Sequence, residues 1–180
     1  MENLSGKPSE SLYDRRRSRK LAFLLRHDRK YRYDEGGWRD VSGLISDYGF
    51  TLDELRVIVA MNNKHRFEFS EDFTKIRARQ GHSVNVDVGL QETVPPDVLY
   101  HGTAAQNVDS ILKNGINKGT RLHVHLSATI EVAESVGRRH GVPVVLTVDA
   151  GKMHDAGLKF YLSRNGVWLT DHVGPEYIRK

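Results

Sequence analysis

A proline-containing segment near the middle of the chain constrains the fold most strongly. Between Val88 and Asp97 the residues GLQETVPPD interrupt the hydrophobic periodicity, and the two adjacent prolines exclude a helix there. The 180 residues suffice for one domain or for two small lobes, each able to bury apolar side chains. We therefore expect a flexible N-terminus at residues 1–10, a first lobe at residues 11–90 and a second lobe at residues 91–180.

Composition excludes several classes of protein. Apolar residues make up 38% of the chain and charged residues 28%, a balance typical of a folded globular protein. The absence of cysteine excludes a disulfide scaffold, a thiolate metal site and a thiol nucleophile. The first residues, MENLSGKPSES, lack the apolar stretch of a signal peptide, and no apolar run is long enough to cross a membrane. We expect a soluble intracellular monomer, cytoplasmic or, in a eukaryote, nuclear, with no membrane partner.

Positive charge is concentrated near the N-terminus. The chain carries 27 Lys and Arg against 23 Asp and Glu. From Arg15 to Arg32, nine of eighteen residues are basic and only Asp28 is acidic. Such a block attracts the phosphates of a nucleic acid, whatever its sequence. A solvated helix face is the other interpretation of the same charges.

The first lobe has the pattern of three helices followed by a hairpin. The first helix ends near His27, Asp40 is expected to cap the second, which stops at Gly49, and Thr51–Glu54 is a capping box for the third. Phe67–Phe69 and Thr74–Arg79 then alternate as two strands around a turn. This order predicts the winged variant of the helix-turn-helix. The helical residues expected to face the core are Leu21, Leu24, Leu25, Val41, Leu44, Ile45, Tyr48, Leu55, Ile58 and Val59.

The second lobe mixes short strands with helices, so the fold class is α+β. Helices are expected from Val108 to Gly115, and from a cap at Thr129 to Gly141. The expected strands are Val98–Tyr100, His123–Leu126, Val144–Val148, Phe160–Leu162 and Val167–Thr170. Neither G-x-G-x-x-G nor G-x-x-x-x-G-K-[ST] occurs, so neither a Rossmann nor a P-loop phosphate site is supported.

Two motifs of the first lobe carry phosphate-binding side chains. Arg26 and His27 end the basic helix, and a guanidinium beside an imidazole suits a phosphate dianion. Interaction of His27 with the helix carbonyls is the alternative. Arg77 and Arg79 share one face of the second hairpin strand, so spacing alone leaves open which one meets a ligand. A charged edge strand that prevents aggregation is the alternative for both arginines.

Three further motifs lie in the second lobe. His101-Gly102-Thr103 is expected at the exit of a strand, where an exposed glycine backbone can grip a sugar or phosphate; Thr103 as a helix cap is the alternative. His123 and His125 share a strand face, so one interpretation is a zinc site completed by His101 or His140. The other interpretation is a polar strand edge that reaches a ligand. Of the adjacent Arg138 and Arg139, only one can face inward.

The candidate site is rich in arginine and histidine and poor in carboxylates. No carboxylate pair accompanies these motifs as it would in a glycosidase or a two-metal nuclease, and no G-x-S-x-G elbow occurs. Such a site favours an anionic substrate. A nucleophile that is already an anion needs no general base.

Seven ordered motifs together resemble one family, the NAD-dependent RNA 2′-phosphotransferases that remove the splice-junction 2′-phosphate of tRNA. The motifs are LLRHD (24–28), GW (37–38), RAxQGHS (77–83), LYHGT (99–103), RxHVHLS (121–127), VGxRHGxPVVL (136–146) and NGVWLT (165–170). The resemblance covers about Ser18 to Ile178 and implies a winged-helix lobe followed by an ADP-ribosyltransferase-like, NAD-binding lobe. It departs from the family pattern at Arg29 and at the string VGPEYI (173–178).

The resemblance also implies a reaction and its residues. NAD is the co-substrate, no metal is expected, and the partner is 2′-phosphorylated RNA, such as a tRNA splice junction. The 2′-phosphate displaces nicotinamide, and the adjacent ribose hydroxyl then attacks the phosphate, which releases ADP-ribose 1″,2″-cyclic phosphate. The implied phosphate-handling quartet is Arg26, His27, Arg77 and Arg139, with His27 as the candidate for proton transfer. The implied NAD contacts are His101, Gly102, Thr103, Arg121, His125 and Ser127.

Three rival hypotheses remain open from sequence. A transferase of the same fold would modify another acceptor, such as a nucleic-acid terminal phosphate. A winged-helix regulator would dock its basic helix on duplex DNA and show no dependence on NAD. A histidine zinc hydrolase would bind stoichiometric zinc.

Overall fold

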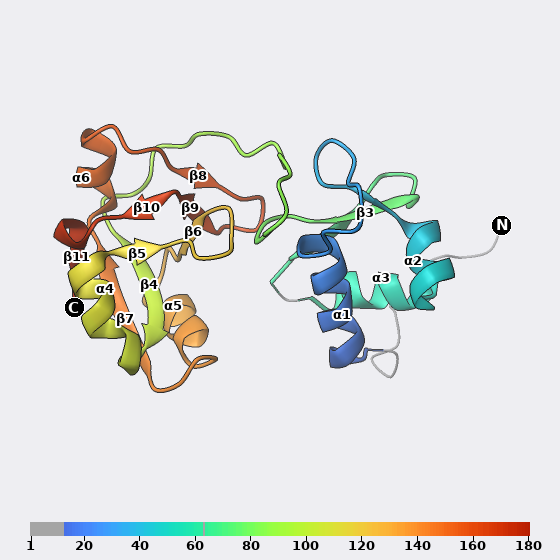
Figure 1. Cartoon of the computed structure of the whole chain (residues 1–180), viewed down its shortest axis with the longest axis horizontal. Helices are drawn as coiled ribbons and strands as arrows, with labels where there is room; N and C mark the ends of the chain where they lie inside the picture. Colours follow the sequence, from blue (N-terminus) through green and yellow to red (C-terminus); the bar gives the residue numbers. More distant parts are fainter. Residues whose placement is uncertain (1–12, 63) are drawn as a thin grey trace. The chain divides into compact units, whose positions relative to one another are not determined.

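The computed structural model describes residues 13–62 and 64–180 (Figure 1). The N-terminal segment expected at residues 1–10 lies outside this range. The chain divides into two compact units, one up to Val88 and one from Gly89 onward, and each has its own hydrophobic core. The expected mixture of helices and strands is confirmed, because α1–α6 combine with small antiparallel sheets (Figure 1).

The first unit contains the three expected helices and the hairpin. Its elements are α1 (Arg15–Arg26), β1 (Arg39–Asp40), α2 (Val41–Tyr48), α3 (Leu52–Ala60), β2 (Phe67–Phe69) and β3 (Lys75–Ala78). The sequence pattern missed β1, which pairs with β3 and gives the antiparallel order β1-β3-β2. Leu21, Leu25, Leu44, Leu55 and Ile58 are fully buried in the core of this unit.

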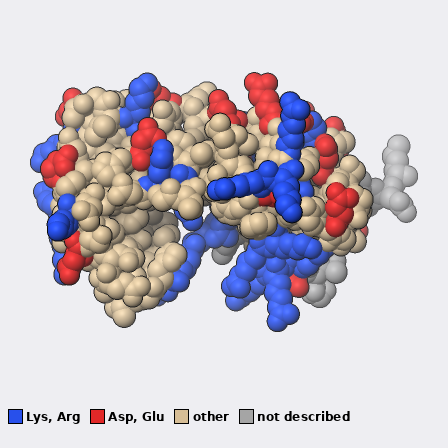
Figure 2. All heavy atoms as spheres, in the orientation of Figure 1, with Lys and Arg blue, Asp and Glu red and all other residues tan. Residues whose placement is uncertain are grey.

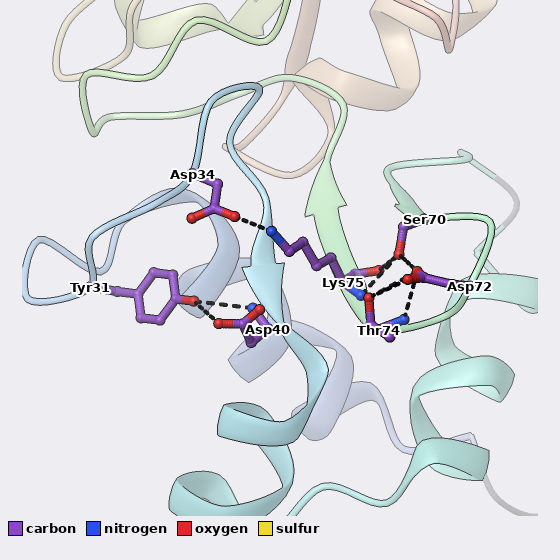
Figure 3. Close-up of polar contacts among 7 residues, drawn as sticks. All are labelled: Tyr31, Asp34, Asp40, Ser70, Asp72, Thr74 and Lys75. Atoms are coloured by element: carbon purple, nitrogen blue, oxygen red, sulfur yellow. Dashed lines mark hydrogen bonds and ion pairs between the residues drawn. The ribbon is translucent and has the colours of Figure 1, made fainter.

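Caps explain where the helices of the first unit begin. The Thr51 hydroxyl accepts a hydrogen bond from the Glu54 amide at 3.1 Å, so the predicted cap of α3 is confirmed. The predicted side-chain cap of α2 is wrong. The Asp40 carboxylate accepts instead from the Tyr31 hydroxyl at 3.3 Å and makes no cap bond (Figure 3). Ile45, expected in the core, is 40% exposed because α2 lies at the surface of the unit.

The hairpin turn is held by side chains around Asp72 (Figure 3). The Asp72 carboxylate accepts hydrogen bonds from the Ser70 hydroxyl at 2.6 Å and the Thr74 amide at 3.1 Å. These bonds lower the pKa of Asp72 to about 2. Lys75 forms an ion pair with Asp34 of the preceding loop (Figure 3). The contacts fix the register of β3, which carries Arg77 opposite Glu68 of β2.

The second unit consists of short strands with three helices beside them. Its elements are β4 (Leu99–Ala104), η2 (Ala105–Asn107), α4 (Val108–Asn114), β5 (Ile116–Asn117), β6 (Val124–Leu126), α5 (Ile130–Gly137), β7 (Pro143–Val148), α6 (Ala150–Asp155), β8 (Tyr161–Leu162), β9 (Trp168–Thr170), β10 (His172–Val173), η3 (Pro175–Tyr177) and β11 (Ile178–Arg179). They form the sheets β11-β7-β4, β6-β9-β8 and β10-β5. Backbone bonds between Tyr100 and Ser127, at 2.8 and 2.9 Å, hold β4 beside the end of β6.

Several sequence expectations for the second unit need correction. β4 continues through His101-Gly102-Thr103 instead of ending before them, because β7 pairs with it as far as Ala104 and Pro143. α5 begins at its expected Thr129 cap but ends at Gly137, four residues before Gly141. The pattern also missed α6 and the two-residue strands β5, β10 and β11, whereas the expected strand Phe160–Leu162 is present as β8. Within residues 13–62 and 64–180, no helix is both long and apolar enough to cross a membrane.

Candidate functional site

The C-terminal end of α1 presents Arg26 and His27. The His27 amide donates to the Phe23 carbonyl at 2.8 Å and ends the helix there, as predicted. The chain that follows β3 returns to this end. The Ser83 amide donates to the Arg26 carbonyl at 2.9 Å, and the Ser83 hydroxyl lies 2.9 Å from His27 Nδ1. Ser83 thus satisfies a helix-end carbonyl and orients the imidazole at once. Ser83 is the last residue of the RAxQGHS motif, and the motif alone did not indicate this role.

A buried ion pair fixes the residue after His27. Arg39 Nη1 lies 2.8 Å from Asp28 Oδ2 and also donates to the Leu24 carbonyl at 3.0 Å. Burial acts to raise the pKa of Asp28, but hydrogen bonds and the charge of Arg39 outweigh it, and the net pKa is lowered. Arg39 also stacks on Tyr31, with its guanidinium 4.0 Å from the ring centroid. No sequence pattern pointed to this pair, which anchors the turn that follows α1.

Arg77 is buried and held on three sides. Its Nε lies 2.7 Å from Glu68 Oε1, its Nη1 donates to the Gly36 carbonyl at 2.9 Å, and its guanidinium lies 4.4 Å from the Trp38 ring centroid. The Gly36-Gly37 turn, with positive φ at both residues, brings that carbonyl and the ring to the arginine. The GW motif is therefore part of the setting of Arg77.

Arg79 shares the same carboxylate but is more exposed. Its Nε lies 2.9 Å from Glu68 Oε2, and its side chain is 25% exposed against 8% for Arg77. The two arginines share one face of the hairpin, as the period of two predicts. The edge-strand alternative is wrong, since β3 is the central strand of its sheet.

His82 lies among Arg26, His27 and Arg77, the three members of the implied quartet that belong to the first unit. It is 3% exposed, and burial together with the charges of Arg26, His27 and Arg77 lowers its pKa to about 4. Within the described residues its Nε2 has no hydrogen-bond partner. We name Arg26, His27, Arg77 and His82 the phosphate cluster. The sequence did not single out His82, although its position in RAxQGHS could have suggested it.

The buried His82 predicts a pH dependence of stability. Its pKa in the folded chain, about 4, lies below the ordinary histidine value of 6.5, so the unfolded chain binds the proton more readily. The free energy of unfolding should therefore fall as pH drops from 6.5 to 4, by up to about 3 kcal/mol from this residue. Urea unfolding at pH 7, 5.5 and 4.5 measures the loss. His82→Asn and His82→Gln should flatten the pH profile; a profile as steep as in the parent protein would contradict this prediction.

In the second unit, two of the predicted NAD contacts, His101 of β4 and His125 of β6, lie side by side. A ring nitrogen of His101, Nδ1, lies 3.4 Å from the His125 carbonyl, and His125 Nδ1 lies 3.0 Å from the His123 carbonyl. Burial lowers the pKa of His101, which keeps its imidazole neutral. Ser127 follows β6 and pairs with Tyr100 through the backbone.

The other two residues of the HGT string are buried. Gly102 is the point where α5 approaches β4, because a Cβ there would lie 1.7 Å from the Ala133 carbonyl oxygen. The expected exposure of the Gly102 backbone is therefore wrong, and its contact with NAD stays a prediction. Thr103 is 5% exposed, lies within β4 and caps no helix; its hydroxyl accepts from Asn107 at 3.4 Å.

The charge of Arg139 acts on Arg121, whereas Arg138 forms an ion pair with Glu134 of α5. Desolvation and the charge of Arg139 lower the pKa of Arg121. Arg138 Nη2 lies 2.7 Å from Glu134 Oε1, one turn earlier on α5. Two adjacent cations that repel each other favour an anion between them. We name His101, Arg121, His125, Ser127 and Arg139 the second-unit group.

The histidines raised for zinc make other contacts. The His123 ring packs against Tyr161, with centroids 5.7 Å apart. In the part of the chain that the structure describes, no three His, Cys, Asp or Glu side chains gather as a metal ion requires.

The quartet implied by the resemblance is thus divided between the units. Arg26, His27 and Arg77 lie around His82 in the first unit, and Arg139 lies beside Arg121 in the second. That all four act on one phosphate stays a prediction.

Comparison with known proteins gives one consistent family. The model of the RNA 2′-phosphotransferase, Tpt1 / KptA family matches residues 13–172. A relative in Flavobacterium johnsoniae is 49% identical over 89% of this chain and 93% of its own length. Relatives in Nostoc punctiforme (51% identical over 81% of this chain and 83% of theirs) and Agrobacterium fabrum (48%, 89% and 91%) are similar. All three are named "Probable RNA 2′-phosphotransferase". The motifs, the match across both units and these identities agree, and the chain belongs to the RNA 2′-phosphotransferase family.

Proposed function

We propose that this protein is an NAD-dependent RNA 2′-phosphotransferase, built from a winged-helix lobe and an ADP-ribosyltransferase-like lobe. It would remove an internal 2′-phosphate from RNA, such as a tRNA splice junction, and release nicotinamide and ADP-ribose 1″,2″-cyclic phosphate. The gathering of Arg26, His27 and Arg77 around the buried imidazole of His82 carries the proposal, because side chains that can bind a phosphate lie together there. Among the described carboxylates, only Glu68 forms an ion pair with Arg77. Family membership supports the same activity.

The second-unit group fits NAD chemically. Arg121 would bind the pyrophosphate, because an anion there would offset the burial and the charge of Arg139 that together lower the pKa of Arg121. Arg139 stays the fourth member of the predicted phosphate-handling quartet. His101 and His125 on adjacent strands would hydrogen-bond ribose hydroxyls without adding charge, since burial holds the pKa of His101 low. NAD supplies an activated ribose carbon from which nicotinamide can leave.

The phosphate cluster would act on the RNA 2′-phosphate. A phosphate dianion is already a nucleophile, so no residue needs to remove a proton before the first displacement. Arg77, rigid between Glu68, Gly36 and Trp38, would hold phosphate oxygens bidentately, and Arg26 would neutralise the remaining charge. His27, oriented by Ser83, would exchange the proton in the second displacement, when a ribose hydroxyl attacks phosphorus and the RNA 2′-oxygen leaves.

One experiment tests the proposal directly. The protein is incubated with NAD and an RNA oligonucleotide that carries one internal 2′-phosphate. We expect nicotinamide, unmodified RNA and a cyclic ADP-ribose phosphate in equal amounts, and no phosphate removal without NAD. An oligonucleotide of the same sequence with only a 5′-phosphate is the matched control. If ADP-ribose from NAD accumulates on either RNA without release, the protein modifies another acceptor, and the proposed phosphate removal is wrong.

Ser83→Ala should slow the reaction without unfolding the protein. The change removes the hydroxyl 2.9 Å from His27 Nδ1 but keeps the Ser83 amide on the Arg26 carbonyl. Loss of one orienting hydrogen bond, worth about 1 kcal/mol, predicts a fall in kcat of roughly fivefold to tenfold. Single-turnover kinetics measure it, with Ser42→Ala on exposed α2 as control. An unchanged rate for the second displacement would contradict the role given to Ser83.

A further inference from the structure

The outer face of α1 leads directly to the phosphate cluster. Arg16, Arg19 and Phe23 are exposed and follow one another at intervals of three and four residues, so they lie on one side of the helix. The same spacing continues from Phe23 to His27. We name Arg16, Arg19 and Phe23 the α1 track. Figure 2 shows Lys and Arg side chains gathered over α1.

Phe23 is an aromatic side chain that the core does not use. Its residue is 56% exposed, whereas Leu21, Leu24 and Leu25 on the other side of α1 are buried. Its ring centroid lies 6.0 Å from that of His27, at a tilt of 48°. A phenyl ring held in solvent next to a candidate catalytic imidazole offers a flat surface on which a base can stack.

The arginines of the track differ from the other cations of α1. Arg17 is bound to both Glu54 oxygens, at 2.5 and 2.9 Å, and lies 3.8 Å from the centroid of Phe50. Lys20 reaches the Tyr48 carbonyl at 3.5 Å. Among residues 13–62 and 64–180, no carboxylate forms an ion pair with the guanidinium of Arg16 or Arg19. These two arginines can therefore bind phosphates without first breaking a contact to the described chain.

We propose that single-stranded RNA flanking the 2′-phosphate lies along α1, with the neighbouring base stacked on Phe23 and the next backbone phosphates at Arg19 and Arg16. The inference rests on the proposed function. With a rise of about 1.5 Å per residue, Phe23 lies about 6 Å along the axis from His27, Arg19 about 12 Å and Arg16 about 16 Å. Only an unpaired strand offers a base face and phosphates to one helix surface, because bases in a duplex are covered by their neighbours.

Two substrates and matched variants test the track. One substrate is a dinucleotide that carries the 2′-phosphate, and the other is a single-stranded decamer with the same modification in its middle. Arg16→Gln with Arg19→Gln should lower kcat/KM for the decamer about tenfold at low salt and leave the dinucleotide unchanged. Its slope of log kcat/KM against log salt should become shallower by about 1.4, or 0.7 for each phosphate contact. Arg56→Gln with Lys113→Gln removes the same charge from exposed positions elsewhere and should change neither.

Two substitutions test whether the flat ring of Phe23 is what contributes to RNA binding. Phe23→Leu removes the flat ring but keeps an apolar side chain, and should lower kcat/KM for the decamer roughly fivefold to a hundredfold, mainly through KM. Phe23→Trp should restore it. Because the position is exposed, circular dichroism of both variants should match that of the parent protein.

The outcomes separate this inference from the proposed function. If the unmodified protein releases no nicotinamide with the dinucleotide, the proposed function fails before any α1 variant is made. If it does release nicotinamide, and the α1 variants equal the Arg56/Lys113 control on the decamer, the track is wrong. A duplexed decamer that reacts faster than the single strand, with the gain lost in the Arg16/Arg19 variant, would also overturn the single-stranded assignment.

Discussion

Replacing Arg77 by alanine should reduce 2′-phosphate removal on the order of 10²–10³-fold, the usual cost of losing one preorganised charge-stabilising donor. Arg77 is held in the phosphate cluster by Glu68, Gly36 and Trp38. The loss should appear in kcat as well as in kcat/KM, because the guanidinium would stabilise charge during both displacements. Steady-state assays on the 2′-phosphorylated oligonucleotide measure it.

Arg79→Ala is the matched control, since Arg79 binds the other oxygen of Glu68. It removes the same charge from the same strand face and should cost no more than about fivefold, the size of a weak, solvent-screened contact. Arg77→Lys should recover little, because an ammonium cannot reproduce the bidentate geometry. Thermal unfolding of the three variants checks that each folds. If Arg79→Ala is inactive and Arg77→Ala is active, Arg79 and not Arg77 binds the phosphate, and this prediction is wrong.

Local sequence signals predicted much of the fold. The apolar spacing of Leu21, Leu24 and Leu25, the Thr51 cap and the end of α4 at Gly115 depend on residues within one or two helical turns, and all are confirmed. The predicted Asp40 cap failed because Tyr31, from another loop, competes for its carboxylate. The strand of His101 was predicted too short because its length depends on pairing with β7, which lies about forty residues away in the chain.

The candidate site shows the same division between local and long-range information. Motif order was enough to select Arg26, His27 and Arg77 as candidates. The contacts that hold them were not accessible to pattern analysis: Ser83 lies 56 residues from His27, and Gly36 lies 41 residues from Arg77. The low pKa of His82 results from burial and from three neighbouring groups that only folding brings together. A sequence pattern can therefore select reactive residue types, but tertiary contacts fix their orientation and protonation.

Gly102→Ala should destabilise the second unit severely. A Cβ at this position would lie 1.7 Å from the carbonyl oxygen of Ala133 and 2.5 Å from its carbon, so the backbone of α5 would have to move away from β4. Overpacking against backbone should cost about 3 kcal/mol or more, a large part of the 5–15 kcal/mol that stabilises a typical domain. Gly137, at the end of α5, packs against the Thr103 backbone. The same displacement would therefore shift Gly137 and also Arg139, two residues later.

The two tryptophans allow this effect to be assigned to one unit. Trp38 belongs to the first unit, and Trp168 is buried in the second core. In a Trp38→Phe background, denaturant unfolding followed by fluorescence reports Trp168 alone, and Gly102→Ala should shift its midpoint strongly downward or abolish the transition. Gly43→Ala, on α2 with no atom within 4 Å of the added carbon, should leave that transition unchanged and stabilise α2 by up to about 1 kcal/mol. Because the clash involves main-chain atoms, no side-chain rotation can relieve it; an unshifted Trp168 transition would therefore show that α5 does not pack on β4 as described.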